Sequence, residues 1–534
     1  MTSFHDIPHK YRHVLLGLIV LLGFGLRLHG LDRMGFNEDE INKVDAARSY
    51  LRGNFSVDVE HPMFMKSLVT LSVVTADAWN KRWGARHRIP EEIAVRFPNV
   101  VFGSLTAVAL FLLAKEFFGS GVALLTALLW STGTFSIAIN RIAKEDTLLV
   151  FFTWLAYYFY LRAKFRGQME NRRREQYYAA SGVAFGLMWA SKYFPYFFGQ
   201  NFLYYGLIGA KQGYPPLRTR YALLVFGLPI LVFLLFNPVI LFPSTFHAML
   251  EYVRHGNEVH QGYLMMGEFR SSSPSHLRDG MPIYFYLLFL LIKTPVAIVI
   301  AFGVGLVDVV RRWREGGPFF VLLMSLLWIV PYSLLGGKWL RWMLSWMPTI
   351  YIIAAIGIAR LLLWSSKIGT RWLSRPGISR GLGFALSGAM VAAFLVQPAW
   401  VGLRSGPYYT LYLNSLGLGR TAYYFPLEEM NDIGLREAIQ KICREAPTGS
   451  SVGSEAGPVF TYYFHRFGRD DLRFFDLSDP AQRSQLGSGS YLVVQDGRKY
   501  FQNIEFIRAV EASQIPIHTV TVNGAIAASI YRQP

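Results

Sequence analysis

Long apolar segments recur along most of this chain, and they limit its fold more than any other feature. A transmembrane helix needs roughly 17–25 mostly apolar residues. Segments near that length occur at 14–28, 97–118, 121–140, 146–163, 177–193, 194–210, 221–242, 284–309, 318–336, 342–364 and 381–403. The pattern predicts a polytopic α-helical membrane protein with about eleven transmembrane helices. Only 16% of the residues are charged, against about 25% in soluble domains, which also argues against a soluble enzyme.

Two of these segments leave room for interpretation. The first follows a basic N-terminus, as in a signal peptide, but no small-residue cleavage site comes after Leu28, so we interpret it as an uncleaved first span. The stretch 177–210 is compatible with two short spans or with one long helix and a re-entrant piece. Pro195 lies where a break would fall, because proline disrupts the interior of a helix.

Basic residues are concentrated in four of the loops, and they fix an expected orientation. Counting eleven spans from a cytoplasmic N-terminus puts all four loops on the cytoplasmic side, as the positive-inside rule requires. Their basic residues are Arg162, Lys164, Arg166, Arg172, Arg173 and Arg174; Lys211, Arg218 and Arg220; Arg311, Arg312 and Arg314; Lys367, Arg371, Arg375 and Arg380. This placement explains much of the net charge of +18 without a nucleic-acid partner.

The same topology predicts a membrane domain over 1–403 and a soluble outer α/β domain over 404–534. Two long loops, about 30–95 and 243–283, also fall outside. Within the tail we expect helices at 434–445 and 500–512 and a buried strand at 490–495. Strands at 518–522 and 525–531 flank Asn523-Gly524, which is a typical hairpin turn.

The first outer loop carries the most distinctive charges. Glu38, Asp39 and Glu40 follow one another directly after the first span, and Arg96 and Asp146 lie at the outer ends of later spans. A carboxylate can take a proton from an acceptor hydroxyl, and a cation can hold a phosphate that leaves. The set therefore suits chemistry on an anionic lipid headgroup, although single charges flank every membrane span.

Lys293 lies inside the apolar segment 284–309, where an unpaired ammonium group costs several kcal/mol. Two alternatives follow: its stem extends toward the interface, or it binds an anionic group in a cavity. Lys192 presents a similar case near a break.

The second outer loop contains His255, His260 and Tyr263 in an unusually polar stretch, which makes these residues candidate substrate contacts or part of a solvated loop. No His-Glu-x-x-His spacing occurs, and the single cysteine, Cys443, excludes an intramolecular disulfide. We therefore predict no metal site, and no cofactor is required; a divalent metal is compatible with the sequence but not indicated.

Several of these residues also carry a family resemblance. The stretch from Asp39-Glu40 through Gly53 to His61-Pro62 resembles the first outer loop of the protein O-mannosyltransferase family, which includes the aminoarabinose transferases of lipid A. Further similarities in order and spacing cover about 14–365 and 423–439. They are Arg96-Phe97-Pro98, Arg141 with Asp146-Thr147-Leu148, Ser191-Lys192, Lys293-Thr294-Pro295 and Lys338 to Arg341.

The resemblance implies the GT-C fold and an inverting glycosyltransferase. Such an enzyme moves a sugar from a polyprenyl-phosphate donor to a hydroxyl acceptor on the outer face of the membrane. By the same resemblance Asp39 matches the general base, Glu40 its neighbour and Asp146 a second acidic residue. Arg96 and Lys293 match positions near the donor phosphate, with Arg341 and His61 as further candidates. The family's His-Pro-Pro-Leu is His61-Pro62-Met63-Phe64 here, and Glu38 is an alternative base.

The implied partners are the bilayer, a polyprenyl-phosphate sugar, and a protein, lipid or glycan acceptor. The implied location is the bacterial inner membrane, as a multi-pass protein with its active site and tail outside the cytoplasm. The alternative function is a transporter or flippase of a lipid-linked anionic glycan. The clustered acids of the first loop favour the enzyme, because transport has no need of them.

Overall fold

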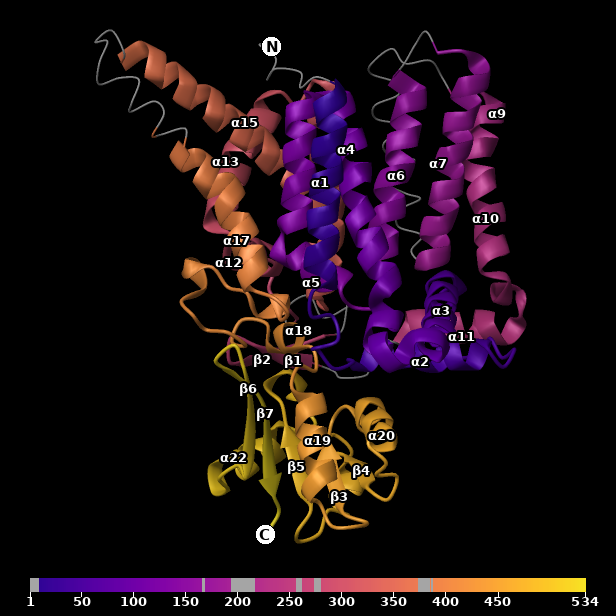
Figure 1. Ribbon diagram of the computed structural model, residues 1–534, viewed down its shortest axis with the longest axis vertical. Coiled ribbons are helices and arrows are strands. Elements are labelled where there is room, and N and C mark those ends of the chain that lie inside the picture. Colours follow the sequence, from indigo (N-terminus) through magenta and orange to yellow (C-terminus); the bar gives the residue numbers. More distant parts are fainter. Residues whose placement is uncertain are drawn as a thin grey trace.

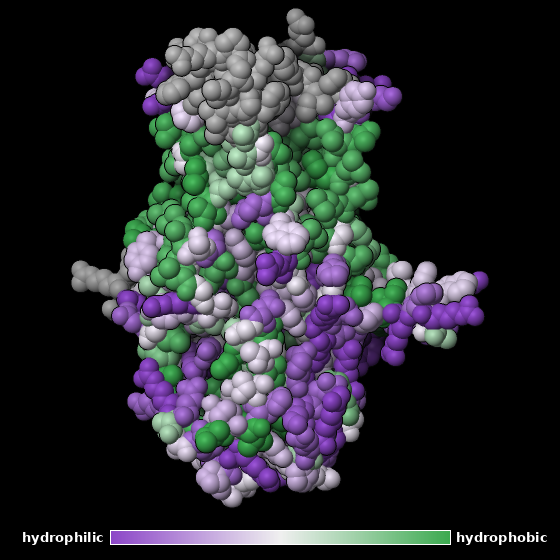
Figure 2. Space-filling view, turned by 60° about the vertical axis from the view of Figure 1, so that its left-hand side comes forward, coloured by the Kyte–Doolittle hydropathy of each residue, from purple (hydrophilic) through white to green (hydrophobic). Residues whose placement is uncertain are grey.

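The computed structural model describes residues 9–165, 169–193, 217–255, 262–272, 280–372, 385 and 388–534. A bundle of long helices occupies one half of the molecule and a smaller α/β unit the other, with the N-terminal and C-terminal ends of the chain at opposite ends (Figure 1). Apolar surface gathers around the bundle, whereas hydrophilic surface covers most of the α/β half (Figure 2). A bilayer therefore fits around the bundle.

The bundle is built from helices whose sequences are predominantly apolar. Its main members are α1 (His9–Leu28), α4 (Glu91–Thr132), α5 (Thr134–Asn140), α6 (Asp146–Phe165), α7 (Asn171–Ser191), α9 (Thr219–Ala222), α10 (Leu228–Phe236), α12 (Phe285–Lys293), α13 (Val296–Arg311), α14 (Gly316–Leu334), α15 (Met347–Trp372) and α17 (Gln397–Arg404). Five helical stretches in the described residues are long and apolar enough to cross a membrane. The prediction of a polytopic helical membrane protein is confirmed, and the count of eleven stays a prediction.

One backbone break lies between two predicted spans, and another divides a single predicted span, each for a local reason. The segments 97–118 and 121–140 fall mainly in α4, which is broken at Gly119 (φ 83°, ψ 172°), a conformation that glycine tolerates. The segment 284–309 is divided between α12 and α13, because Pro295 lacks an N–H and disfavours helical geometry at Thr294. Lys293 is therefore the last residue of a short helix. The segment 194–210 lies outside the described residues.

Shorter elements from the segments 30–95 and 243–283 lie between the bundle and the α/β unit. They are α2 (Glu38–Tyr50), α3 (Met63–His87), α11 (Pro243–His255) and the antiparallel hairpin of β1 (Gly262–Met265) and β2 (Glu268–Ser271). A capping box starts α2: the Asn37 side chain accepts from the Glu40 N–H at 3.0 Å, and the Glu40 carboxylate accepts from the Asn37 N–H at 3.2 Å. The three consecutive acids thus form the first turn of α2.

The tail forms a five-stranded sheet with the order β4-β3-β5-β7-β6, in which β3 pairs parallel with β4 and β5, and β7 pairs antiparallel with β5 and β6. Its elements are α18 (Pro426–Met430), α19 (Leu435–Glu445), β3 (Ser451–Ser454), α20 (Gly457–Arg466), β4 (Arg473–Asp476), α21 (Pro480–Arg483), β5 (Tyr491–Val494), α22 (Ile504–Ser513), β6 (His518–Val522) and β7 (Ala525–Arg532). The predicted helix at 434–445, strand at 490–495 and closing hairpin are confirmed. The helix predicted from residue 500 starts at Ile504.

The tail is tied closely to the rest of the molecule. The Tyr463 hydroxyl accepts from the Phe36 N–H at 2.8 Å, and the Arg466 guanidinium pairs with Glu92 at 2.8 Å. Nearer the bundle, the Asn414 amide donates to the carbonyl of Thr294 at 2.6 Å. The first part of the tail therefore packs against the helices, and the division at residue 403 stays a prediction.

Candidate functional site

The three acids at the start of α2 each pair with a different cation. Glu38 binds the guanidinium of Arg498, a residue of the tail, at 2.7 Å. Asp39 binds Lys144 and Arg341, and Glu40 binds Arg96. Consecutive residues on a helix point about 100° apart, so three neighbours in sequence enter three different environments.

The Glu40–Arg96 pair is buried and saturated. Arg96 donates to both oxygens of Glu40, at 2.7 and 2.6 Å, and its three remaining N–H groups reach the carbonyls of Leu31, Met34 and Gly35. Both side chains are at most 1% exposed. All five guanidinium donors are thus used inside the protein, and Arg96 has none left for the donor phosphate that the sequence assigned to it.

Asp39 has a different environment, because its side chain is 39% exposed. Its Oδ2 lies 2.7 Å from the Lys144 ammonium and 3.3 Å from the Arg341 guanidinium. Burial alone would raise the pKa of Asp39, but Lys144 and Arg341 outweigh it and hold the pKa well below its usual range. Asp39 is therefore a stable carboxylate held between two cations.

A pocket of about 340 Å³, partly open to solvent, surrounds this carboxylate. Its lining comes from α2, α5, the loop before α6, the 3-10 helix η3 (Leu340–Ser345) and the tail: Asn37, Asp39, Ile139, Ile142, Lys144, Arg341, Thr410, Glu428 and Asn431. A second pocket, of about 320 Å³, shares Ile139, Thr410 and Glu428 with it and extends to Lys293. The two pockets are neighbours across these shared residues.

Lys293 faces the second pocket with a partner of its own. Its ammonium lies 2.5 Å from Glu429 and 2.9 Å from the carbonyl of Thr410. Lys293 is 4% exposed and Glu429 fully buried. One of the two alternatives for Lys293 was an anionic group bound in a cavity. The anionic group that pairs with it is Glu429, which belongs to the protein's own tail.

The other predicted residues lie around these pockets. The Asp146 carboxylate binds Lys192 at 2.7 Å, and its second oxygen is buried without a hydrogen-bond partner among the described residues. His61 Nε2 lies 4.0 Å from Glu145; burial keeps the pKa of His61 well below its usual range despite that carboxylate, so the ring is neutral.

Tyr263 is buried and stacks on Trp339, with ring centroids 5.5 Å apart. The Arg341 guanidinium lies 4.8 Å from the same indole ring. Tyr263 therefore supports the segment that carries Arg341. His255 is the last residue of α11, and His260 lies outside the described residues. No group of three or more His, Cys, Asp or Glu suited to a metal ion occurs within the described part of the chain.

Comparisons with known proteins agree with this architecture. Residues 88–242 match the family described as dolichyl-phosphate-mannose-protein mannosyltransferase. The crystal structure of ArnT from Cupriavidus metallidurans bound to undecaprenyl phosphate has a TM-score of 0.53 and 14% identity over 98% of each chain. The chain therefore shares the GT-C fold of these membrane proteins, and the family match covers residues 88–242.

A second similar GT-C structure comes from an archaeon. The oligosaccharyltransferase AglB from Archaeoglobus fulgidus, in complex with an inhibitory peptide and a dolichol-phosphate, has a TM-score of 0.53 and 11% identity, covering 88% of this chain and 65% of that one. No curated protein sequence matches the chain.

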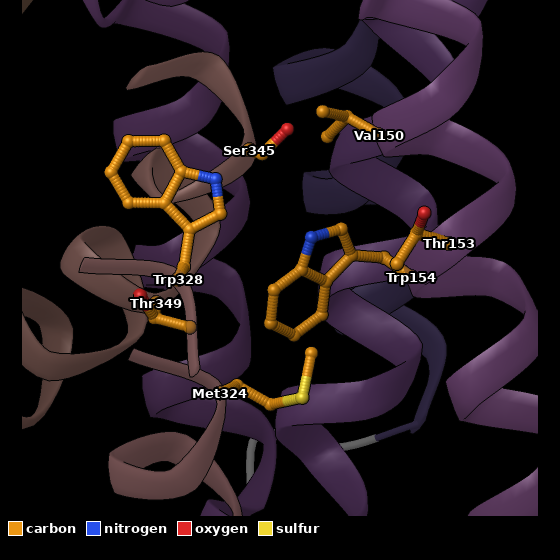
Figure 3. A pocket seen from close by; sticks show the side chains of 7 residues that line it. All are labelled: Val150, Thr153, Trp154, Met324, Trp328, Ser345 and Thr349. Carbon is orange, nitrogen blue, oxygen red and sulfur yellow. The ribbon is translucent and has the colours of Figure 1, made fainter. Parts of the chain in front are cut away.

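The GT-C bundle also contains an apolar pocket on the membrane side of the charged residues. It is small, with room for about one water molecule. It lies between Val150, Thr153 and Trp154 of α6, Met324 and Trp328 of α14, Ser345 of η3 and Thr349 of α15. The two indole rings face each other across it (Figure 3). The pocket is linked to the charged one through shared elements: Val150 follows Asp146 by one turn of α6, and Ser345 ends the 3-10 helix that carries Arg341.

Two residues of the charged pocket escaped the sequence analysis. Lys144 stands between Arg141 and Asp146, inside a segment already singled out, so its position was the available signal. Glu428 lies in the segment 423–439 that carries part of the resemblance, but nothing there connected it with Asp39, from which more than 380 residues separate it in the chain.

Proposed function

We propose that this chain is a glycosyltransferase that moves a sugar from a polyprenyl-phosphate donor to a hydroxyl acceptor on the outer face of the membrane, with inversion at the anomeric carbon. The observation that carries the proposal is the pocket around Asp39, where a partly exposed carboxylate meets two cations at the pocket wall. This combination matches the chemistry of a lipid phosphate.

The two cations suit the leaving group. Arg341 presents a guanidinium that forms paired hydrogen bonds with phosphate oxygens, and Lys144 adds a compact positive charge. Both lie at the pocket wall and are paired with a carboxylate that stays exposed. As the bond between the anomeric carbon and the phosphate oxygen breaks, these cations stabilise the charge that develops on the polyprenyl phosphate.

A transfer assay tests the proposal. Purified protein in detergent is incubated with a series of polyprenyl-phosphate sugars and with peptide, lipid and glycan acceptors, and the products are identified by mass spectrometry. We expect polyprenyl phosphate and a glycosylated acceptor whose anomeric configuration, measured by NMR, is inverted. Transfer from a nucleotide sugar in the absence of lipid carrier would refute the donor class. Movement of an intact lipid-linked glycan across vesicles without sugar transfer would favour the flippase.

The orientation needs a test of its own, because native Cys443 is buried. In a Cys443→Ser background, we place single cysteines at Ser488 in the tail and at Arg173 in the first turn of α7, both exposed positions. An impermeant thiol reagent added outside intact cells should label the first and spare the second. The reverse pattern would overturn the proposed outer location of the site.

A further inference from the structure

Four residues of the tail hold the short segment 32–38, which leads from α1 into α2. They come from four separate places: the turn before α19, α19 itself, α20 and the 3-10 helix η7 (Asp496–Arg498). The residues are Asp432, Arg436, Tyr463 and Arg498. Because Asp39 is the next residue of the chain, the position of this segment bears directly on the pocket around Asp39.

The first part of the segment is held by its backbone. Arg436 donates to the carbonyl of Asp32 at 2.8 Å and also to that of Arg33. The N–H of Phe36 donates to the hydroxyl of Tyr463 at 2.8 Å. Since every residue carries the same backbone groups, these contacts specify where the chain runs rather than which side chains it bears.

Asp432 holds the residue directly before Asp39. Its Oδ2 accepts from the N–H of Glu38 at 3.0 Å. Glu38 is the first residue of α2, where an N–H has no partner inside the helix, so Asp432 supplies that partner from the tail. Arg498 donates to both oxygens of Asp432, at 2.7 and 2.6 Å, and to the Glu38 carboxylate at 2.7 Å. The side chains of Asp432 and Arg498 are only 4% and 10% exposed.

Asp432 reaches α2 from an unusual stretch of backbone. Asn431 and Asp432 have φ angles of 42° and 64°, in the left-handed region, which side chains rarely adopt and which Asn and Asp tolerate best. Such conformations persist where the surrounding structure holds them, and they gather at functional sites. Here the same turn places Asn431 in the lining of the Asp39 pocket and Asp432 against α2.

The turn is also fixed on either side along the chain. Before it, Glu429 of α18 pairs with Lys293 at the end of α12, at 2.5 Å, and α18 lies between the bundle and the sheet of the tail (Figure 1). After it, the Gln495 amide donates to the carbonyl of Ile433 at 2.7 Å. The segment 429–433 therefore joins α12, α2 and the tail sheet, so the place of the tail governs the place of the first turn of α2.

We propose that Asp432 is a positioning residue for the transfer reaction, through which the tail sets the place of Asp39 in the pocket, a role that rests on the proposed function above. Asp39 Oδ2 lies 2.7 Å from Lys144 and 3.3 Å from Arg341, and a small shift of the first turn of α2 would change both distances. A misplacement of about 1 Å can cost a reaction roughly 10²-fold in rate. The tail thus contributes to catalysis through geometry, without a chemical step of its own.

Two double variants isolate the contact with Glu38. Asp432→Gly/Arg498→Met and Asp432→Asn/Arg498→Met both remove the whole ion pair, so neither leaves one of its members buried alone. Gly and Asn both tolerate a left-handed φ, but only Asn keeps an oxygen that can accept from the Glu38 N–H. With saturating donor and acceptor, the Gly variant should lower kcat for sugar transfer by roughly 10²-fold. The Asn variant should regain most of the rate.

The chain offers a matched control within the tail. Asp471 is also bound through both oxygens by one arginine, Arg469, at 2.8 and 2.9 Å, and it also accepts from a backbone N–H, that of Gly449, at 2.9 Å. The variant Asp471→Gly/Arg469→Met therefore removes the same groups away from segment 32–38. Its kcat should stay near the wild-type value.

A double-mutant cycle with Asp39→Asn separates positioning from general destabilisation. The kcat of Asp39→Asn should change little when Asp432→Gly/Arg498→Met is added, because the carboxylate that the contact positions is already gone. Tyr463→Phe, which removes the hydroxyl that holds Phe36, is an independent second test. It should lower kcat by less than the Gly variant and should likewise add little to Asp39→Asn. Thermal unfolding in detergent is measured for every variant, and Tyr463→Phe decides the question if the Gly variant unfolds.

The outcomes separate the two proposals. A wild-type protein that transfers no sugar from any polyprenyl-phosphate donor would refute the proposed function. With an active wild type, an unchanged kcat in both the Gly variant and Tyr463→Phe would overturn only the positioning role. Losses that multiply in full with that of Asp39→Asn, or an Asn variant as slow as the Gly variant, would overturn it as well.

Discussion

Glu40 and Asp39 are neighbours in the chain, yet their surroundings differ in burial and in how their charges are paired. Around Glu40, one carboxylate meets one guanidinium, every donor is satisfied, and both groups are almost inaccessible to solvent. Around Asp39, one half-exposed carboxylate meets two cations at the wall of a pocket. The first region has balanced charge and a full set of hydrogen bonds, whereas in the second two cations share one partly exposed carboxylate at the wall of a pocket.

The contrast shows how to separate structural charges from functional ones. A saturated buried pair stabilises the fold only as long as both members remain, because removing one leaves an uncompensated charge. A site with surplus charge and access to solvent can accept an anionic ligand without breaking the fold. Four variants, in decreasing order of expected effect, test whether the two regions divide in this way.

Glu40→Gln should give the largest change, and it should affect folding. The substitution leaves the Arg96 guanidinium buried without its carboxylate, which costs roughly 3–5 kcal/mol of the free energy of unfolding. Thermal unfolding in detergent measures the loss. The double variant Glu40→Gln/Arg96→Met should regain part of the stability. A melting temperature equal to that of wild type would contradict a structural role for this pair.

Asp39→Asn should reduce catalysis by roughly 10²–10³-fold, because Lys144 and Arg341 lose the carboxylate that orients them. The free energy of unfolding should change little, since the side chain is 39% exposed and asparagine has almost the same shape. The measurement is kcat with saturating donor, alongside thermal unfolding. An unfolded Asp39→Asn protein would place this residue in the same structural class as Glu40.

Arg341→Met should weaken donor binding by roughly 10–100-fold, the equivalent of a lost charged hydrogen bond of 1.5–3 kcal/mol. Titration of the donor lipid in the transfer assay measures this effect, and the acceptor KM should stay near its wild-type value. Arg96→Met provides the comparison, and we expect it to lower stability instead. Equal effects of the two arginine variants on the donor KM would contradict the assignment of Arg341 to donor binding and of Arg96 to stability.

Glu38→Gln should have the smallest effect. Its carboxylate is 34% exposed and pairs with Arg498, which also holds Asp432 at 2.6 Å. A partly exposed ion pair of this kind contributes roughly 0.2–1 kcal/mol, so activity should change only a few-fold. A loss of activity as large as that of Asp39→Asn would identify Glu38 as a functional acid and would place it in the same class as Asp39.

The sequence located the acidic cluster and the cations, but it did not separate the residues that line the pocket from those that are fully paired inside the protein. It singled out Asp39, Arg341 and Asp146, which line the pocket or lie near it, together with Arg96, which the structure saturates with internal partners. It described Lys293 as embedded in a span, whereas the chain breaks at Thr294-Pro295 and provides Glu429 as a partner. The resemblance over 423–439 includes Glu428 but did not single it out.

The sequence by itself determined the helical membrane architecture and the secondary structure of much of the tail, because hydropathy, charge and turn residues act over short distances along the chain. Only the tertiary structure decided which acid meets which cation. Arg341 lies 302 positions from Asp39, and Arg498 lies 460 positions from Glu38. Pairings over such separations depend on how the helices and the tail pack, and a local sequence pattern does not determine that packing.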